Sequence, residues 1–268
     1  MINDEPPPLM LKVIACEVAT REICAVVATS RNTICLEFLS QAHHEKPMNG
    51  AAEIQQRIDA TPTSQFDAIL LGYGLCNRLL DGVTARDTKL VIPRAHDCLT
   101  FLIGSRERYL DHFMKRPGSY YYSTGWMEGP RRVGRDIQQN EVGELLGEDL
   151  DSLIERYGEE NARYLMELGM QWRQKYARGS FIRHDFLDHL KMDRQVQKTC
   201  QQNGWAYEEI PASLCMLRSW IDGDWESDDF IIVQPGMTIR PTYDERVIEP
   251  VNELSDPRPQ IIENGFDH

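Results

Sequence analysis

Short apolar runs alternate with amphipathic segments along the first half of the chain. The runs predict buried strands at residues 9–16, 33–39, 66–71, 89–93 and 119–123. The segments between them carry apolar side chains at helical spacing and predict helices over residues 17–29, 48–59 and 100–115. Strands separated by helices indicate βαβ units, and therefore a mainly parallel sheet with both faces covered. Right-handed crossovers then restrict the topology to a doubly wound α/β type.

The second half of the chain repeats this alternation after a polar, glycine-rich interval. Strands are predicted at residues 180–182, 205–210 and 229–234, and helices at residues 149–176, 188–202 and 213–221. The simplest interpretation is two Rossmann-like halves, although the second half could instead extend a single sheet. We place an N-terminal half at residues 9–127, a linker at 128–148, a C-terminal half at 149–236 and a tail rich in Pro, Asp and Glu at 237–268.

The balance of charge excludes some classes of partner. The chain has 268 residues, with 42 Asp and Glu against 29 Lys and Arg, and a formal net charge of −13. A field of this sign repels nucleic acid and anionic lipid surfaces. No run approaches the roughly 20 apolar residues of a membrane-spanning helix, and the acidic, proline-rich N-terminus lacks the features of a signal peptide. We therefore expect a soluble, cytoplasmic protein that binds neither membranes nor nucleic acid.

Seven cysteines are an odd number for a disulfide framework, and a chain of this size does not need one, so we expect free thiols. Cys24 and Cys35 fall inside a predicted helix and a predicted strand, and we assign both to the hydrophobic core. Cys200 and Cys215 fall on predicted helices of the second half, where we interpret them as structural.

The other three cysteines stand where predicted strands end, in loops that also carry histidine and tryptophan. In chain order these positions are Cys16, His43 and His44, Cys76, the segment 94–98 (RAHDC), and Trp126. In an open parallel sheet the loops at the carboxyl ends of the strands gather at one edge, and ligands bind there. We therefore expect these side chains to form one site.

Thiolate and imidazole groups are ligands for soft metals. Cys16, Cys76 and Cys98 could hold a zinc ion with one open position, or three irons of a four-iron cluster. His96 or His44 would then serve as a fourth ligand or as a proton donor. No pair of these cysteines has the local spacing of a CxxC knuckle, so buried thiols without a metal are the alternative.

Further side chains are expected around such a site. Asp97 would orient an imidazole, and one of the nearby arginines would hold a carboxylate or phosphate of the substrate. The predicted substrate-binding residues are Tyr73, Gly74, Arg94, Arg106 and Trp126. No complete GxGxxG, Walker, GxSxG or HExxH motif occurs, so no motif indicates a dinucleotide cofactor.

Four segments of the chain resemble one protein family. They are residues 71–77 (LGYGLCN), 92–98 (IPRAHDC), 104–109 (GSRERY) and 122–126 (YSTGW). Together they resemble domain-of-unknown-function family 1638, over about residues 12–235. Members occur in bacteria and methanogenic archaea, some encoded near corrinoid-dependent methyltransferase systems. The family's glycine in the loop after the second strand is Ala42 here, while His44 takes the family's histidine position.

The resemblance supplies no activity, but it implies that Cys16, Cys76, His96 and Cys98 form one site, and it suggests one-carbon or thiol chemistry. We predict a metal-dependent enzyme of small-molecule metabolism, a transferase or lyase, with methyl or sulfur transfer as the expected reaction. One alternative is a non-catalytic protein that binds or delivers metal, or serves a corrinoid or methyltransferase protein. Another is a metal-free enzyme with Cys98 as nucleophile and His96 as base.

Overall fold

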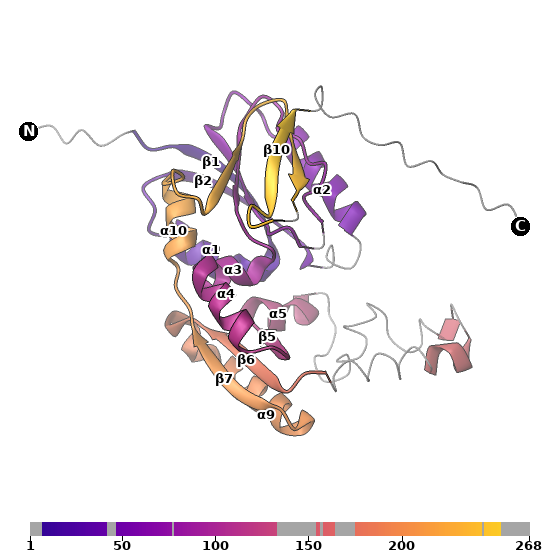
Figure 1. Ribbon diagram of the computed structural model, residues 1–268. Coiled ribbons are helices and arrows are strands. Elements are labelled where there is room, and N and C mark those ends of the chain that lie inside the picture. The colour runs from indigo at the N-terminus through magenta and orange to yellow at the C-terminus, as the bar shows by residue number, and fades with distance from the viewer. Residues whose placement is uncertain are drawn as a thin grey trace, which may run out of the picture.

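Two sheets organise the part of the chain that the structure, a computed structural model, describes (Figure 1). The described residues are 7–41, 47–76, 78–132, 154–155, 158–163, 175–242 and 244–252. The first sheet has the strand order β2-β1-β3-β4-β8. Its strands are β1 (Met10–Cys16), β2 (Thr33–Leu39), β3 (Ala68–Gly72), β4 (Leu90–Pro93) and β8 (Phe230–Val233).

Parallel pairing joins the first four strands of this sheet, and β8 closes it by antiparallel pairing with β4. Every residue of β3 and β4 is buried, as expected for inner strands with helices on both faces. One face is covered by α1 (Thr20–Val27), which follows the short helix η1 (Glu17–Ala19) and packs against α10 (Cys215–Asp222). The helix α2 (Pro47–Asp59) lies on the other side of the sheet (Figure 1).

The second sheet has three parallel strands in the order β5-β6-β7. They are β5 (Ser119–Tyr122), β6 (Arg178–Arg183) and β7 (Ala206–Pro211). The helix α9 (Met192–Asn203) packs on β6 and β7 and lies on the side away from the first sheet (Figure 1). Between the two sheets lie α3 (Cys98–Ile103), α4 (Arg106–Lys115) and α5 (Thr124–Arg132), and α5 packs on η1.

The mainly parallel α/β class expected from the sequence is confirmed, but the strands do not divide between the sheets as the two predicted halves do. β5 belongs to the second sheet, although it falls within residues 9–127. β8 belongs to the first sheet, although it falls within residues 149–236. The chain therefore leaves the first sheet after β4 and returns to it only at β8.

Two predicted irregular segments contain regular structure. Residues 128–132 of the predicted linker belong to α5, and the rest of that linker lies outside the described residues. The predicted tail begins with an antiparallel hairpin of β9 (Met237–Pro241) and β10 (Ile248–Asn252), and residues 253–268 lie outside the described residues. Most of the helix predicted at 149–176 also lies outside them.

The assignment of Cys24 and Cys35 to the core is wrong, because both side chains are exposed. Cys35 lies on the edge strand β2 and pairs in register with Lys12, whose ammonium group reaches a carboxylate oxygen of Glu37 at 2.7 Å on the same outer face. Cys24 lies on the outer side of α1. Cys200 is buried, as expected, whereas Cys215 is exposed at the start of α10.

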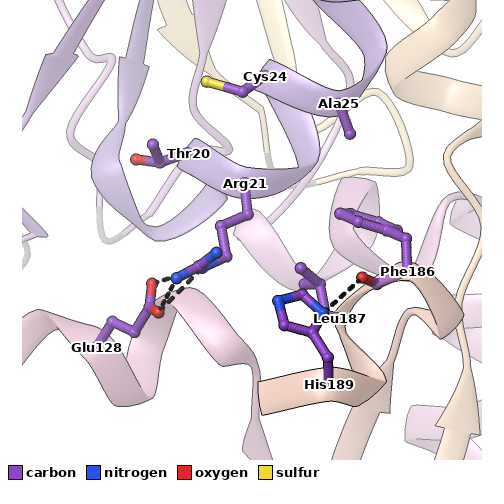
Figure 2. Close-up of a pocket in the computed structure, with 8 residues that line it drawn as sticks. All are labelled: Thr20, Arg21, Cys24, Ala25, Glu128, Phe186, Leu187 and His189. Atoms are coloured by element: carbon purple, nitrogen blue, oxygen red, sulfur yellow. Dashed lines mark hydrogen bonds and ion pairs between the residues drawn. The ribbon is translucent and has the colours of Figure 1, made fainter.

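An ion pair joins α1 to α5 where the two sheets meet (Figure 2). The Arg21 guanidinium donates from Nη2 and Nε to the Glu128 carboxylate, at 2.6 Å and 2.9 Å from Oε1. Both groups line an open hollow of about 800 Å³ between α1 and the short helix η3 (Asp185–Leu190). Because the charges of Arg21 and Glu128 neutralise each other, neither is available to pair with a charged ligand in this hollow.

A buried histidine lies at the same junction. His184 follows β6, and its Nε2 is 3.9 Å from a carboxylate oxygen of the buried Glu22 on α1. Burial lowers the pKa of His184 to about 4, despite a hydrogen bond to the backbone of Leu102 and the nearby charge of Asp185. Burial outweighs the attraction here because the imidazole is almost entirely removed from water.

No helix within the described residues is long and apolar enough to cross a membrane.

Substitution of Gly72 by alanine should destabilise the protein. A Cβ atom there would lie 2.5 Å from the Cβ of Ala15 and 3.1 Å from the Trp220 ring, which is fully buried and donates from Nε1 to the carbonyl of Val91. Overpacking of this kind costs about 1–3 kcal/mol. We expect Gly72→Ala to lower the free energy of unfolding in urea by that amount. Adding Ala15→Gly should restore part of it, and equal stability of the single variant and the wild type would contradict this packing.

The stability of the protein should fall in acid because of His184. Its pKa is lower in the folded chain than the ordinary value of about 6.5, so the unfolded chain binds more protons between pH 6.5 and pH 4. The contribution of the neutral imidazole is complete above pH 6.5 and is lost as the pH falls toward 4. We expect urea titrations to show that the free energy of unfolding of the wild type falls over this window by on the order of 2–3 kcal/mol more than that of the His184→Gln variant. Identical dependence of the free energy of unfolding on pH in the two proteins would contradict the prediction.

Candidate functional site

The loops after β3 and β4 run side by side beyond the ends of their strands. The backbone N–H of Leu75 donates to the carbonyl of Ala95 at 2.8 Å, and that of Cys76 donates to the carbonyl of His96 at 2.9 Å. These two bonds continue the parallel pairing of the strands past the edge of the sheet. They bring the segment before Cys76 against the segment before Cys98.

This approach is so close that it requires glycine at position 74. A Cβ atom there would lie 2.7 Å from three backbone atoms of Asp97, a separation at which backbone would have to move. Cys76, two residues on, has a φ of 42°. A non-glycine residue in this region costs on the order of 1 kcal/mol, and such strain is concentrated at functional sites. The strained backbone at Cys76 thus determines where its side chain lies.

Three thiols meet at this edge of the first sheet. Cys16 ends β1, Cys76 follows β3, and Cys98 begins α3; their exposed fractions are 0%, 4% and 7%. The sulfur atoms of Cys76 and Cys98 are 3.6 Å apart, and none of the three cysteines forms a disulfide. Hydrogen bonds with Cys16 and Cys76, followed by burial, raise the pKa of the Cys98 thiol well above its ordinary value. The fold therefore brings together the three cysteines that the sequence singled out.

Tyr73 places a hydroxyl group beside these thiols. Its side chain is 1% exposed, and its hydroxyl has no hydrogen-bond partner among the described residues. Burial, followed by the proximity of the three cysteines, raises the pKa of this phenol. An unpaired buried hydroxyl costs roughly 1–3 kcal/mol, so the site holds a polar group available to a ligand.

A metal site is not already formed by side chains in the described part of the chain. No group of three or more His, Cys, Asp and Glu side chains there is arranged to hold an ion. His44, one of the two histidines predicted to complete the site, lies outside the described residues. The other, His96, is exposed, and its carbonyl rather than its imidazole contacts the cysteine loop.

Asp97 fixes the start of α3 and therefore the position of Cys98. Its Oδ1 accepts the Leu99 N–H at 3.0 Å as the helix N-cap, and its Oδ2 accepts the Tyr109 hydroxyl at 2.9 Å. Burial raises the pKa of this carboxyl group, against the lowering effect of those hydrogen bonds. The charge of His96 also lowers the pKa of Asp97, and the expectation that Asp97 orients an imidazole stays a prediction.

A cavity of about 290 Å³ opens beside Cys98, between α3, β5 and α5. Most of its walls are aromatic or aliphatic. Its other lining residues are Val18, Asp97, Leu99, Leu102, Ser119, Tyr120, Tyr121, Ser123, Trp126 and Tyr176. Of the predicted substrate-binding residues, Trp126 lies here. This cavity connects the thiol cluster to a space that fits a small molecule.

Arg94, Arg106 and His96 line a different cavity, also of about 290 Å³. Both guanidinium groups donate to backbone carbonyls: Arg94 to those of residues 228 and 246, and Arg106 to those of residues 228 and 245. Burial, followed by the charge of Arg106, lowers the pKa of Arg94. The hydrogen bond between Tyr109 and Asp97 lies between the two cavities, since Tyr109 lines this one and Asp97 the other.

Sequence reasoning missed most of the aromatic lining of the Cys98 cavity. The consecutive tyrosines at residues 120–122 were a visible signal, and two of them line the cavity. Tyr176 gave no signal, because it stands in a segment whose pattern is helical. Its position depends on the pairing of β5 with β6, which local periodicity does not encode.

In the metal-free protein, alkylation of Cys98 should need a higher pH than that of an exposed cysteine. The thiolate is the reactive form, and the neighbouring thiols and burial raise the pKa of Cys98. We expect the rate of iodoacetamide labelling, followed by mass spectrometry, to rise with a midpoint well above the ordinary thiol value of about 8.5. Cys35, which is exposed, serves as the internal control. A Cys98 midpoint at or below the ordinary value would show that the thiol is instead activated.

Comparison with known proteins identifies a family without an activity. No curated protein and no solved structure matches the chain. Residues 38–221, which are more than half of the 268, match the family described as "Protein of unknown function (DUF1638)". The matched residues include Cys76 and Cys98 together with the loops that hold them, while Cys16 precedes the match. The chain therefore belongs to the DUF1638 family.

Proposed function

We propose that Cys16, Cys76 and Cys98 bind a soft metal, as a zinc ion or an iron–sulfur cluster, and that the protein is an enzyme acting on a small molecule held beside Cys98. The observation that carries this proposal is the meeting of three buried thiols, none of them in a disulfide, from three separate strand ends. A single buried cysteine is common in proteins, because cysteine behaves as a small apolar residue. Three buried cysteines in contact at one sheet edge are not explained by this preference alone.

The spacing of the sulfur atoms suits a shared metal. Tetrahedral zinc with Zn–S bonds of about 2.3 Å separates its sulfur ligands by about 3.8 Å. The sulfur atoms of Cys76 and Cys98 are 3.6 Å apart, whereas a disulfide would need about 2.05 Å. Only a small movement of the side chains would therefore let both sulfur atoms share one ion.

The strand order supports a ligand site at this position. We infer a doubly wound first sheet, because β1 connects to β2 on one side and β3 resumes on the other. Ligands of such sheets bind where the strand order reverses, outside the carboxyl ends of the strands. Cys16 ends β1 and Cys76 follows β3, the two strands at this reversal.

A bound cation also explains how buried thiols would ionise. Three neighbouring thiolates without a cation would repel one another, and this repulsion contributes to the raised pKa of Cys98. A soft metal would stabilise the thiolates and could act as a Lewis acid on a substrate atom or activate a substrate thiol. The Tyr73 hydroxyl would donate to a thiolate or to the substrate. Methyl or sulfur transfer is the reaction class we propose, and seven cysteines outside any disulfide suit the reducing cytoplasm.

A metal-free nucleophile is less well supported. Such a thiol needs a lowered pKa, whereas that of Cys98 is raised. Its proposed base, His96, lines the arginine cavity rather than the cavity of Cys98. A purely carrier role is also less well supported, because a carrier has no need of a cavity beside its ligands.

Metal analysis of protein purified without oxygen tests the proposal. We expect about one zinc per chain, or iron with sulfide and a brown colour, in the wild type. Cys76→Ser and Cys98→Ser should each lose most of this metal, since three ligands become two. Cys200→Ser is the matched control, because Cys200 is buried but packs in a separate cluster on α9. Metal-free wild type, or full metal content in both site variants with native circular dichroism, would rule the proposal out.

A further inference from the structure

The cavity beside Cys98 has no positively charged side chain in its described lining. Its described lining includes one acidic side chain, Asp97, and no Lys, Arg or His. The neighbouring cavity differs in its charged groups, because two arginines and a histidine line it together with one carboxylate, that of Glu245. Although the two cavities are equal in volume and lie on either side of one hydrogen bond, they suit ligands of different charge.

Aromatic rings form much of the wall of the Cys98 cavity. Tyr120 and Tyr176 meet edge to face, with ring centroids 5.4 Å apart and planes at 89°, so they form two perpendicular walls. The Tyr120 ring also packs against Tyr122 and Trp205, at 4.8 Å and 6.1 Å, which holds it in place. Trp126 adds a third ring to the lining. Aromatic faces carry partial negative charge and attract cations.

Three hydroxyl groups in the lining of the cavity are already engaged within the protein. The hydroxyl of Ser119 donates to the carbonyl of Arg116 at 2.9 Å, and that of Ser123 accepts the Trp126 N–H at 3.2 Å. The Tyr121 hydroxyl lies 3.2 Å from Nδ1 of His112. A primary ammonium group has three N–H donors and would lose hydrogen bonds on leaving water for this cavity. A fully methylated ammonium group has no N–H donor and loses none.

We propose that this cavity binds the quaternary, methylated ammonium group of a small molecule. Perpendicular aromatic walls, one carboxyl group and engaged hydroxyls are the features that such a cation requires. The ligand's role as substrate rests on the proposed function, with its methyl groups beside the sulfur of Cys98. Binding itself requires only the cavity.

Calorimetric titration of the full-length, metal-free protein with choline chloride tests the proposal. The matched neutral probe is 3,3-dimethylbutan-1-ol, which has the shape of choline without its charge. We expect choline to bind about tenfold more tightly, because only the cation gains from the ring faces. Equal affinity for the two probes would show a merely apolar cavity and overturn the proposal, as would the absence of any binding of choline.

Substitutions in one wall locate the binding. Tyr176→Leu should weaken choline binding about tenfold and leave that of the neutral alcohol nearly unchanged, whereas Tyr176→Phe keeps the ring face and should bind as the wild type does. Tyr120→Leu repeats the test on the second wall. Undiminished choline binding in both leucine variants would place the site elsewhere and refute the proposal.

The cysteine variants separate this proposal from the metal proposal. Cys98→Ser should retain the preference for choline even where it loses metal, because the aromatic walls are unchanged. If the wild type holds no metal, the proposed function fails, but a preference for choline would still support the cavity proposal. If the two probes bind equally, the cavity proposal fails, but bound metal would still support the proposed function.

Discussion

The contact between the backbone at Gly74 and the backbone at Asp97 determines the geometry of the whole candidate site. Two strand-end loops can pair beyond their sheet only if no side chain stands between them, and glycine meets this condition. The pairing sets Cys76 against Cys98, and the parallel register of β1 with β3 adds Cys16 from the other side. Cys16 and Cys98 belong to a strand and a helix, and Cys76 lies in a loop held by backbone hydrogen bonds, which favours a preformed site over one assembled by loop movement.

Asp97 contributes to this site through structure more than through direct chemistry. As the N-cap of α3 it fixes the helix on which Cys98 stands, and as acceptor for Tyr109 it ties that helix to α4. The same carboxyl group lines the aromatic cavity while its partner lines the arginine cavity. One hydrogen bond thus links two cavities of different polarity. A ligand that breaks this bond from one cavity would also change the lining of the other.

The sequence predicted the parts of the site that depend on local pattern. Apolar runs ending at Cys16 and before Cys76 and Cys98 marked the strand ends, and parallel pairing was sufficient to bring the three thiols together. The aromatic cavity could not be predicted, because it depends on β5 leaving the first sheet to pair with β6. Arg94 and Arg106 stand close to Cys98 in the sequence, but their side chains donate to the backbone carbonyls of residues 228, 245 and 246. Periodicity gives the face of a strand and says nothing about which sheet that strand joins.

The return of β8 to the first sheet has a consequence for how the chain is made. The ribosome synthesises β4 long before β8, and every strand of the second sheet is made in the interval. Until β8 is available, β4 presents an open edge of four apolar residues to the surrounding solution. The nascent chain therefore passes through a stage in which strands β1 to β7 have been made and the apolar edge of β4 is still unpaired. This is the stage at which molecular chaperones would be needed most.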